Sequence, residues 1–233
     1  MTYYDIHTHQ PAQHPGDIAV ISMDLSSEPV RKRILSNRHF FEKQVSGQHS
    51  VQTTGYYSIG IHPRHADMKF MGSVREHANQ PAIVAIGETG LDKSAAKDEN
   101  EFRLQQKLFA AHAELSEDVR KPLIIHCVKA WGELLHIRKT IKPTVPWIIH
   151  GFRGNDILAS QLINTGLYLS FGTLYHTTAL KVAWQEQRLL TETDDKDVDI
   201  RNIYKQIAND LDIAEKTLSE TITCFFKTRL ALP

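Results

Sequence analysis

The stretch that decides the fold is AIVAIGETGLD at residues 82–92, in which a run of apolar residues and glycine leads to a glutamate, Glu88. A short apolar run without polar alternation predicts a strand buried on both faces, as in a parallel sheet. Similar runs, each ending in a polar residue or glycine, recur at residues 3–9, 17–24, 56–63, 122–127, 146–151, 166–172 and 188–194. The sequence therefore predicts a parallel sheet of roughly eight strands.

Helical patterns fill the intervals between the later runs. They cover residues 101–115, 131–141, 156–163 and 178–187, and two further amphipathic stretches follow, around 203–211 and 218–226. Strand, helix and strand in this rhythm predict an α/β protein. With about eight strands, the expected architecture is a TIM-type (β/α)8 barrel, and we expect residues 1–233 to form one barrel domain.

The first third of the chain fits this barrel less well. Too few residues separate His9 from Ile18 for the helix that normally connects two parallel strands. Either the barrel is distorted, with a shortened or missing first crossover helix, or the second run is not parallel to the first. Residues 25–55 are polar with weak periodicity, and no element is predicted there.

Composition narrows the class of protein. Lys and Arg together number 27, as do Asp and Glu, so the formal net charge is zero. This balance disfavours a protein that wraps long duplex nucleic acid. Two cysteines, no sign of a secretory signal peptide and no apolar run near about 18 residues predict a cytoplasmic protein that does not cross a membrane. No stable protein partner is evident.

Side chains that can bind metal ions stand at the ends of the apolar runs. In a parallel barrel the carboxyl ends of the strands meet on one face, so these side chains should converge. A single histidine or carboxylate of this kind is more often a packed core residue than a metal ligand. That explanation would have to apply separately at each strand end, which favours a shared metal site. Imidazole and carboxylate suit Zn, Mn, Ni or Fe, and carboxylate also suits Mg. The residues are Asp5, His7, His9, His62, Glu88, His126, His150 and Asp194.

The order of these residues resembles the TatD family of metal-dependent hydrolases and deoxyribonucleases, within the amidohydrolase-like TIM barrels. The resemblance runs from Tyr3 to about Asp195, with a similar closing helix at TLSETITCFFKTRL. It rests on DIHTH, IGIHPRHA, AIGETGLD, PLIIHC, IIHGFRGN and LLTETDD, and AIGETGLD and LLTETD are the most specific of these.

The resemblance implies a centre with two divalent metal ions (Zn, Mg, Mn or Ni) that activates a water for attack on a phosphodiester. One ion would be held by His7, His9 and Asp194, the other by His126 and His150, and Glu88 would bridge them. Asp194 would also accept the proton of the water. His62 would bind phosphate or stabilise the leaving group, Asp5 would orient a ligand histidine, and Arg153 and Lys129 would contact the substrate.

Two stretches depart from the family pattern. QPAQHPGD at residues 10–17 replaces the helix that usually follows the first motif, and DKDVDIRNIYK replaces the usual segment after the last one. Val128 also stands where the family commonly has an arginine after the ligand histidine. The metal positions are present while parts of the substrate-contacting loops are not, so hydrolysis is better supported than DNA as the substrate.

Three functions remain open on this sequence. The first is a phosphodiesterase that trims DNA ends, that is, a metal-dependent deoxyribonuclease. The second is a hydrolase of a small ester, lactone or amide, which the zero net charge and the altered loops favour. The third is a metal-binding barrel without turnover, which the intact ligand set disfavours.

Overall fold

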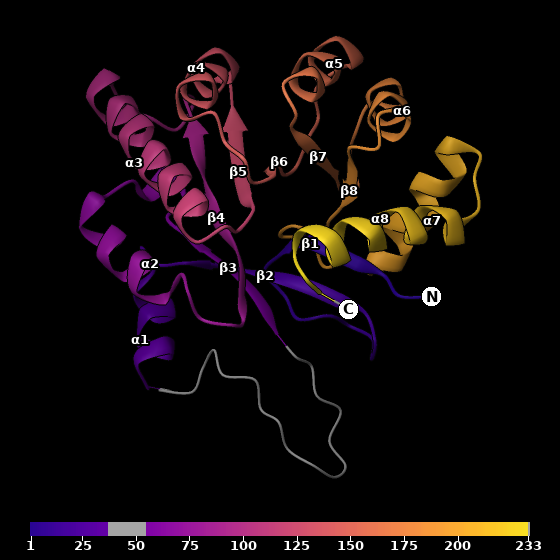
Figure 1. The fold of residues 1–233 in the computed structure, drawn as a ribbon, viewed down its shortest axis with the longest axis horizontal. Coiled ribbons are helices and arrows are strands. Elements are labelled where there is room, and N and C mark those ends of the chain that lie inside the picture. Colours follow the sequence, from indigo (N-terminus) through magenta and orange to yellow (C-terminus); the bar gives the residue numbers. More distant parts are fainter. Residues whose placement is uncertain (37–54, 233) are drawn as a thin grey trace. The chain divides into compact units, whose positions relative to one another are not determined.

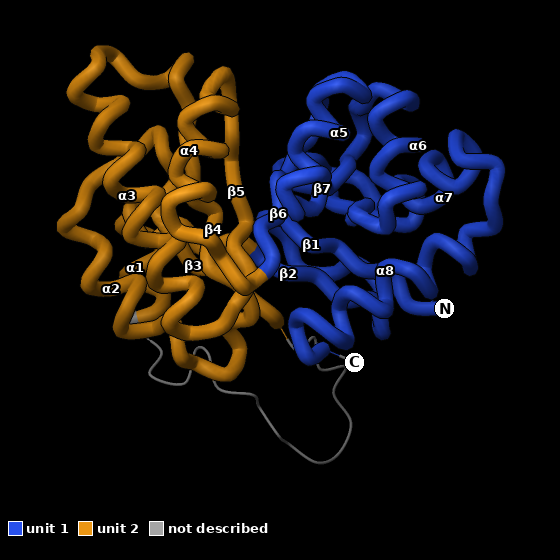
Figure 2. Tube along the Cα trace, turned by 45° about the horizontal axis from the view of Figure 1, so that its top comes forward, with its two compact units in different colours: residues 1–21, 146–233 blue, residues 22–145 orange. Residues whose placement is uncertain are grey.

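The computed structural model describes residues 1–36 and 55–232, which form the eight strands β1–β8 and the helices between them (Figure 1). The chain divides into two compact units, which we call unit 1 (residues 1–21 and 146–233) and unit 2 (residues 22–145) (Figure 2). Strand β2, Ile18–Asp24, contributes its first residues to unit 1 and its last to unit 2.

Unit 2 alternates strands with helices. Two short 3-10 turns, Pro63–His65 and Met68–Phe70, lie between strand β3 and helix α2. Besides the end of β2, its elements are α1 (Glu28–Ser36), β3 (Tyr56–Gly60), α2 (Met71–His77), β4 (Ile83–Asp92), α3 (Glu99–Asp118), β5 (Leu123–Val128) and α4 (Trp131–Ile141).

Strand β4 is the centre of unit 2, and every one of its residues is buried. It pairs in parallel with β3 on one side and with β5 on the other. Gly90 pairs with His126, and a Cβ atom at position 90 would lie 2.0 Å from the His126 carbonyl oxygen. The glycine that follows Glu88 and Thr89 in the sequence is therefore required for β4 and β5 to approach this closely.

Helix α3 packs on β4 through one face. The helix begins where the Asp98 carboxylate accepts hydrogen bonds from the backbone N–H groups of Asn100 and Glu101, which have no partner within the helix. On its buried face, Gln105 accepts a hydrogen bond from the Asp92 N–H at 2.8 Å and donates one to the Asp92 carbonyl at 3.2 Å. The helix therefore holds the carboxyl end of β4 through both backbone groups of Asp92.

Unit 1 is assembled from the two ends of the described chain. Besides the start of β2, its elements are β1 (Tyr4–Thr8), β6 (Trp147–Ile149), α5 (Asp156–Asn164), β7 (Tyr168–Phe171), α6 (Thr177–Gln185), β8 (Leu189–Thr191), α7 (Ile200–Leu211) and α8 (Glu215–Arg229). Strands β6, β7 and β8 pair in parallel in sequence order, and a parallel bridge between Thr8 and Asp194 joins the ends of β1 and β8.

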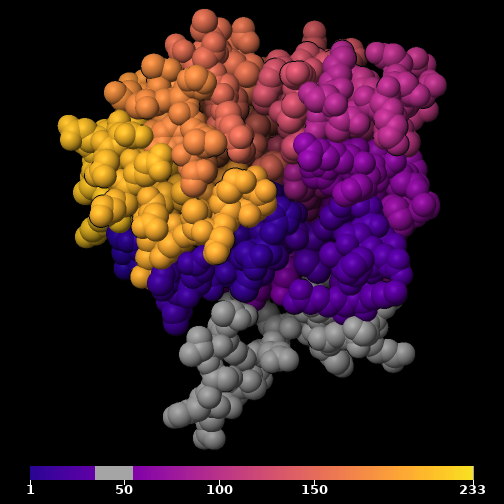
Figure 3. All heavy atoms as spheres, turned by 180° about the vertical axis from the view of Figure 1, so that it is seen from behind, coloured from indigo at the N-terminus to yellow at the C-terminus, as the bar shows by residue number. Residues whose placement is uncertain are grey.

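Strand β1 pairs in parallel with β2, and turns rather than a helix connect them. The prediction that the first crossover helix is missing is thus confirmed. The alternative, that the second strand is not parallel to the first, is wrong. Helix α8 packs against β1 instead: the rings of Tyr4 and Phe226 lie 4.5 Å apart, and Ser219 Oγ donates to the Thr2 carbonyl. In Figure 3 the indigo N-terminal segment accordingly lies beside the yellow C-terminal helices.

The other predicted elements agree with the structure to within a few residues, and helices α1 and α2 are additional. Helix α1 occupies the first part of the interval 25–55, and residues 37–54 of that interval lie outside the described residues. Among the helices that the structure describes, none is long and apolar enough to cross a membrane.

The Gln105 contact gives a prediction about stability. Replacing Gln105 by Leu should lower the free energy of unfolding by about 1–3 kcal/mol, because the buried N–H of Asp92 loses its acceptor. The Asp92 carbonyl loses only one of its donors, since it also accepts from the N–H groups of Ala95 and Ala96. Denaturant unfolding followed by circular dichroism measures the change. The control is Gln106→Leu, at a less buried position of the same helix; an equal loss in both variants would contradict the prediction.

Candidate metal centre

The first cluster lies in unit 1, where β1 and β8 end. His7 is on β1, His9 follows that strand, and Asp194 follows β8. The Asp194 N–H donates to the His7 carbonyl at 3.0 Å, and the His9 N–H donates to the Asp194 carbonyl at 3.2 Å. This pairing brings Asp194 Oδ1 to 3.5 Å from His7 Nε2 and 3.7 Å from His9 Nε2. The geometry can hold one metal ion, because the ligand atoms of all three side chains lie within 4.8 Å of one another.

Asp194 is ionised at neutral pH. Burial raises the pKa of its carboxyl, but the rings of His7 and His9, together with the charge of His150, outweigh burial and hold the pKa well below its ordinary value. A carboxylate in this state can bind a cation or accept a proton from a water within hydrogen-bond reach.

His150 and Glu192 extend the same cluster. His150 directly follows β6, and its ring centroid is 4.2 Å from that of His7. Glu192 Oε1 accepts a 2.6 Å hydrogen bond from the Gly151 N–H and lies 3.7 Å from His150 Nδ1. The Glu192 side chain is buried, and within the described part of the chain its Oε2 atom has no hydrogen-bond partner. A carboxylate oxygen of this kind is well suited to a bound cation.

Asp5, which was expected to orient a ligand histidine, is hydrogen-bonded to the main chain of this cluster. Its Oδ1 accepts hydrogen bonds from the backbone N–H groups of His7 and Thr193, both at 3.2 Å, and its Oδ2 accepts one from Thr193 Oγ1 at 2.6 Å. Asp5 therefore fixes the backbone of His7 rather than its ring. Burial raises the pKa of Asp5 to about 7, against the hydrogen bonds from Thr193.

The second cluster lies in unit 2 and is centred on Glu88. Glu88 Oε1 is 3.1 Å from His62 Nε2 and 3.2 Å from His126 Nδ1. Glu88 lies within β4, His126 is on β5, and His62 follows β3. His62 was expected to bind substrate rather than metal, and the structure places its ring nitrogen close enough to the other two ligand atoms for it to take part in either role.

Asp92 supports His126 from the other side of the ring. Asp92 Oδ2 lies 3.4 Å from His126 Nε2, so one ring nitrogen faces Glu88 and the other faces a carboxylate. A histidine that binds metal usually has such a partner, which fixes the orientation and tautomer of the ring. Burial raises the pKa of Asp92, but His126 and Arg64 outweigh it, and the pKa is lowered overall.

The remaining predicted residues lie in the loops that follow the strands. Lys129 is exposed and directly follows β5 in unit 2, and Arg153 is exposed in the loop after β6 in unit 1. Neither side chain forms an ion pair or hydrogen bond with another described residue, and their expected contact with substrate remains a prediction. Cys127, next to His126, is buried, and burial raises the pKa of its thiol to about 12. Its thiol is therefore protonated at neutral pH.

The two segments that depart from the family pattern contact each other in unit 1. His14 Nε2 lies 2.6 Å from Asp199 Oδ2, and Arg201 Nε donates to Asp17 Oδ2 at 2.9 Å. Together these segments line a small cavity beside Asp5. The two altered segments therefore form hydrogen bonds with each other.

Sequence reasoning missed two residues of these clusters. Glu192 and Asp92 both lie inside quoted motifs, LLTETDD and AIGETGLD, but neither was assigned a role. The sequence signal that could have identified them is a carboxylate at the end of a predicted strand. Both clusters combine imidazole nitrogen with carboxylate oxygen, the donor set that divalent transition metals accept, so the residues present fit metal binding.

Comparison with known proteins agrees with this assignment. The model of the family described as TatD related DNase matches residues 5–227. An uncharacterized metal-dependent hydrolase of Buchnera aphidicola is 27% identical over 83% of this chain and 78% of its own. The hydrolase YcfH of Escherichia coli is 32% identical over 59% of this chain. A 3'-5' ssDNA/RNA exonuclease TatD of Erwinia billingiae is 29% identical over 58% of it.

The matches to the last two relatives span about half of their length, 54% and 53%. Among solved structures, YjjV, a TatD homologue from Escherichia coli, superposes with a TM-score of 0.79 over 99% of this chain and 98% of its own, at 16% identity. A TatD family hydrolase from Entamoeba histolytica gives a TM-score of 0.72 at 16% identity, over 99% of this chain and 98% of its own. These likenesses confirm the expected TIM-barrel fold.

The family match covers nearly the whole chain and includes both ligand clusters. The resemblance noted in the sequence is therefore confirmed, and the chain belongs to the TatD-related DNase family of metal-dependent hydrolases.

Proposed function

We propose that this protein is a metal-dependent phosphodiesterase that removes nucleotides from DNA ends. The observation that carries the proposal is the pair of histidine and carboxylate clusters, one in each unit, at the positions where the family motifs stand. The Erwinia billingiae relative, named as an exonuclease, supports DNA as the substrate. The expected cytoplasmic location remains a prediction.

We assign two divalent cations to these ligands. His7, His9 and Asp194 would hold one, and His126 and His150 the other, with Glu88 as the shared ligand that the family resemblance implies. When bound, such cations polarise the phosphoryl oxygens and lower the pKa of a water. In support of this proposal, His7, His9 and Asp194 lie together in unit 1, and Glu88 lies beside His126 in unit 2.

The protein side chains supply the rest of the chemistry. Asp194, ionised by its two histidine neighbours, accepts the proton of the attacking water. His62, held at 3.1 Å from Glu88, binds the phosphate or stabilises the departing oxygen. Arg153 and Lys129, both exposed, contact the substrate backbone as it enters.

A hydrolase of small esters, lactones or amides is the second candidate. Two observations favour it: the zero net charge, and the altered segments after β1 and β8 that pack on each other beside the unit 1 cluster. A metal-binding barrel without turnover is the third, and it is disfavoured because the expected ligands are present.

Asp194→Asn should lower the rate of DNA cleavage by about 10²–10⁴-fold, because the variant lacks the proton acceptor. The assay is time-resolved cleavage of end-labelled single-stranded DNA with Mg, Mn or Zn, and with a chelator. Stepwise, metal-dependent release of nucleotides is expected from the unaltered enzyme. If that enzyme binds metal but leaves DNA intact, the nuclease proposal is wrong and small esters and amides are the next substrates.

Glu88→Gln should abolish activity and weaken binding of both metal ions, because Glu88 is the only shared ligand. His126→Ala should lower the metal content, whereas His62→Ala should leave it unchanged and reduce turnover. Metal analysis of the purified variants measures this, with exposed His136→Ala on α4 as the control. Equal loss of metal in the His62 and His126 variants would make His62 a ligand.

Glu192→Gln should weaken metal binding by about 10–100-fold. The variant keeps an oxygen that can accept from the Gly151 N–H but loses the negative charge beside His150. Competition with a chromogenic chelator measures the affinity, and the thermal midpoint of the metal-free variant shows whether the fold is retained. Unchanged affinity would limit Glu192 to a structural role.

A further inference from the structure

Arg64 has an unusual position for an exposed side chain. It lies in the 3-10 turn Pro63–His65 that follows β3, and its side chain is 62% exposed. Its Nε atom donates at 3.2 Å to Oδ2 of Asp92, a carboxylate that is only 1% exposed. The acceptor is therefore buried, although most of the arginine side chain faces solvent.

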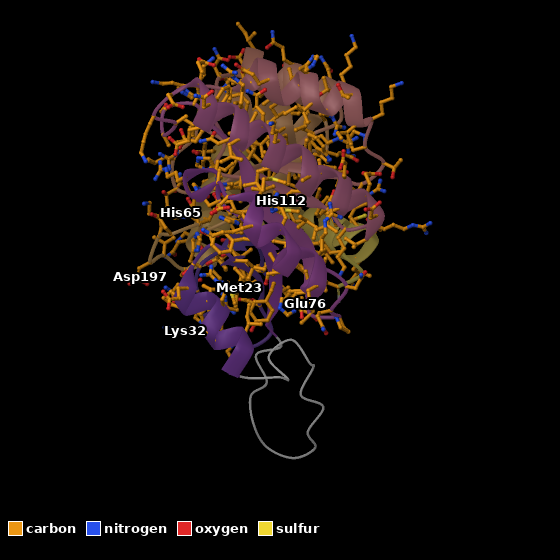
Figure 4. All side chains as sticks on the ribbon, turned by 90° about the vertical axis from the view of Figure 1, so that its left-hand side faces the viewer. Met23, Lys32, His65, Glu76, His112 and Asp197 are labelled. Carbon is orange, nitrogen blue, oxygen red and sulfur yellow. The ribbon has the colours of Figure 1, made fainter. Side chains whose placement is uncertain are left out.

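The turn that carries Arg64 is fixed on both sides. The Arg64 N–H donates to His62 Nδ1 at 3.1 Å, and the other nitrogen of that ring faces Glu88. On the far side, His65, labelled in Figure 4, has its Nδ1 atom 3.0 Å from Asp24 Oδ2. The turn is thus held by His62 of the unit 2 cluster and by the hydrogen bond between His65 and Asp24.

The guanidinium of Arg64 is held in place through only one of its nitrogen atoms. Within the described residues, its single ion pair is the one through Nε, which leaves the two terminal amino groups without a protein partner. The same Asp92 oxygen also contacts His126 Nε2 at 3.4 Å. One carboxylate oxygen therefore separates the guanidinium from a ligand histidine of the unit 2 cluster. A planar group with free paired donors matches the oxygens of a phosphate.

We propose that Arg64 binds a phosphate group of the substrate through its two terminal amino groups, while Asp92 holds the guanidinium at the edge of the unit 2 cluster. This proposal rests on the proposed phosphodiesterase function and names a residue that recognises the substrate. The phosphate belongs either to DNA or to a small phosphodiester, and the experiment separates the two.

The experiment compares Arg64→Ala with the unaltered enzyme and with Arg103→Ala, which removes an exposed arginine of α3 in the same unit. For single-stranded DNA, KM should rise about 10–100-fold with little change in kcat, because the contact is made equally in the bound and the transition state. The slope of log KM against log salt should fall by about 0.7, as expected for one lost phosphate contact. Arg64→Lys should recover only part of the loss, since lysine lacks the paired donors.

Two further readouts exclude a purely structural role. Metal content and thermal midpoint of Arg64→Ala should match those of Arg103→Ala. A variant that loses metal or stability while KM stays unchanged would overturn the proposal, because Arg64 would then only balance the charge of Asp92.

The substrate arms use end-labelled DNA and bis(4-nitrophenyl) phosphate. A raised KM for both assigns the contact to the scissile phosphate, a raised KM for DNA alone assigns it to a neighbouring phosphate, and no change for either overturns the proposal. Titration of inorganic phosphate into the metal-loaded protein tests the Arg64 contact independently of the proposed nuclease function. Binding that is lost in Arg64→Ala, in a protein that cleaves no DNA, supports the Arg64 site while the nuclease proposal fails.

Discussion

The close approach of strands β4 and β5 is the constraint on which the unit 2 cluster depends. A side chain at Gly90 would collide with the His126 carbonyl, so the motif that carries Glu88 must also carry glycine. With the strands this close, Glu88 and His126 come within 3.2 Å of each other, and Asp92 reaches the opposite nitrogen of the same ring. Gln105 then holds the end of β4 against α3. The ligands and their supports are thus fixed by backbone packing.

Unit 1 reaches a similar result with residues from distant parts of the chain. The backbone of Asp194 pairs with His7 and His9, and Asp5 bonds to the backbone at both His7 and Thr193. These bonds place the carboxylate of one strand end against the histidines of another. In the same way, the Gly151 N–H donates to Glu192 and holds this carboxylate next to His150. Hydrogen bonds of the neighbouring main chain thus position the candidate ligands of unit 1.

The sequence was informative where one physical signal dominated. Continuous apolar runs predicted the strands, because strands buried on both faces have no polar alternation. His126 and Asp194 were expected to lie in clusters because the carboxyl ends of parallel strands meet on one face, and each does lie in a group of side chains that could hold a metal ion. Helix α1 was missed because its residues are polar with weak periodicity, and the burial of its face depends on neighbours distant in sequence. The supporting roles of Asp92 and Glu192 also depend on such contacts, which spacing alone does not reveal.

The way the chain is divided between the units has a consequence for biosynthesis. Residues 22–145 form a continuous unit, so the chain of unit 2 is complete before residues 146–233 are translated. Residues 1–21 belong to unit 1 and must wait for residues 146–233, including helix α8, which packs on β1. His7 and His9 are therefore translated before unit 2, whereas their partner Asp194 is translated after it. The unit 1 cluster can therefore form only after the whole of unit 2 has been translated.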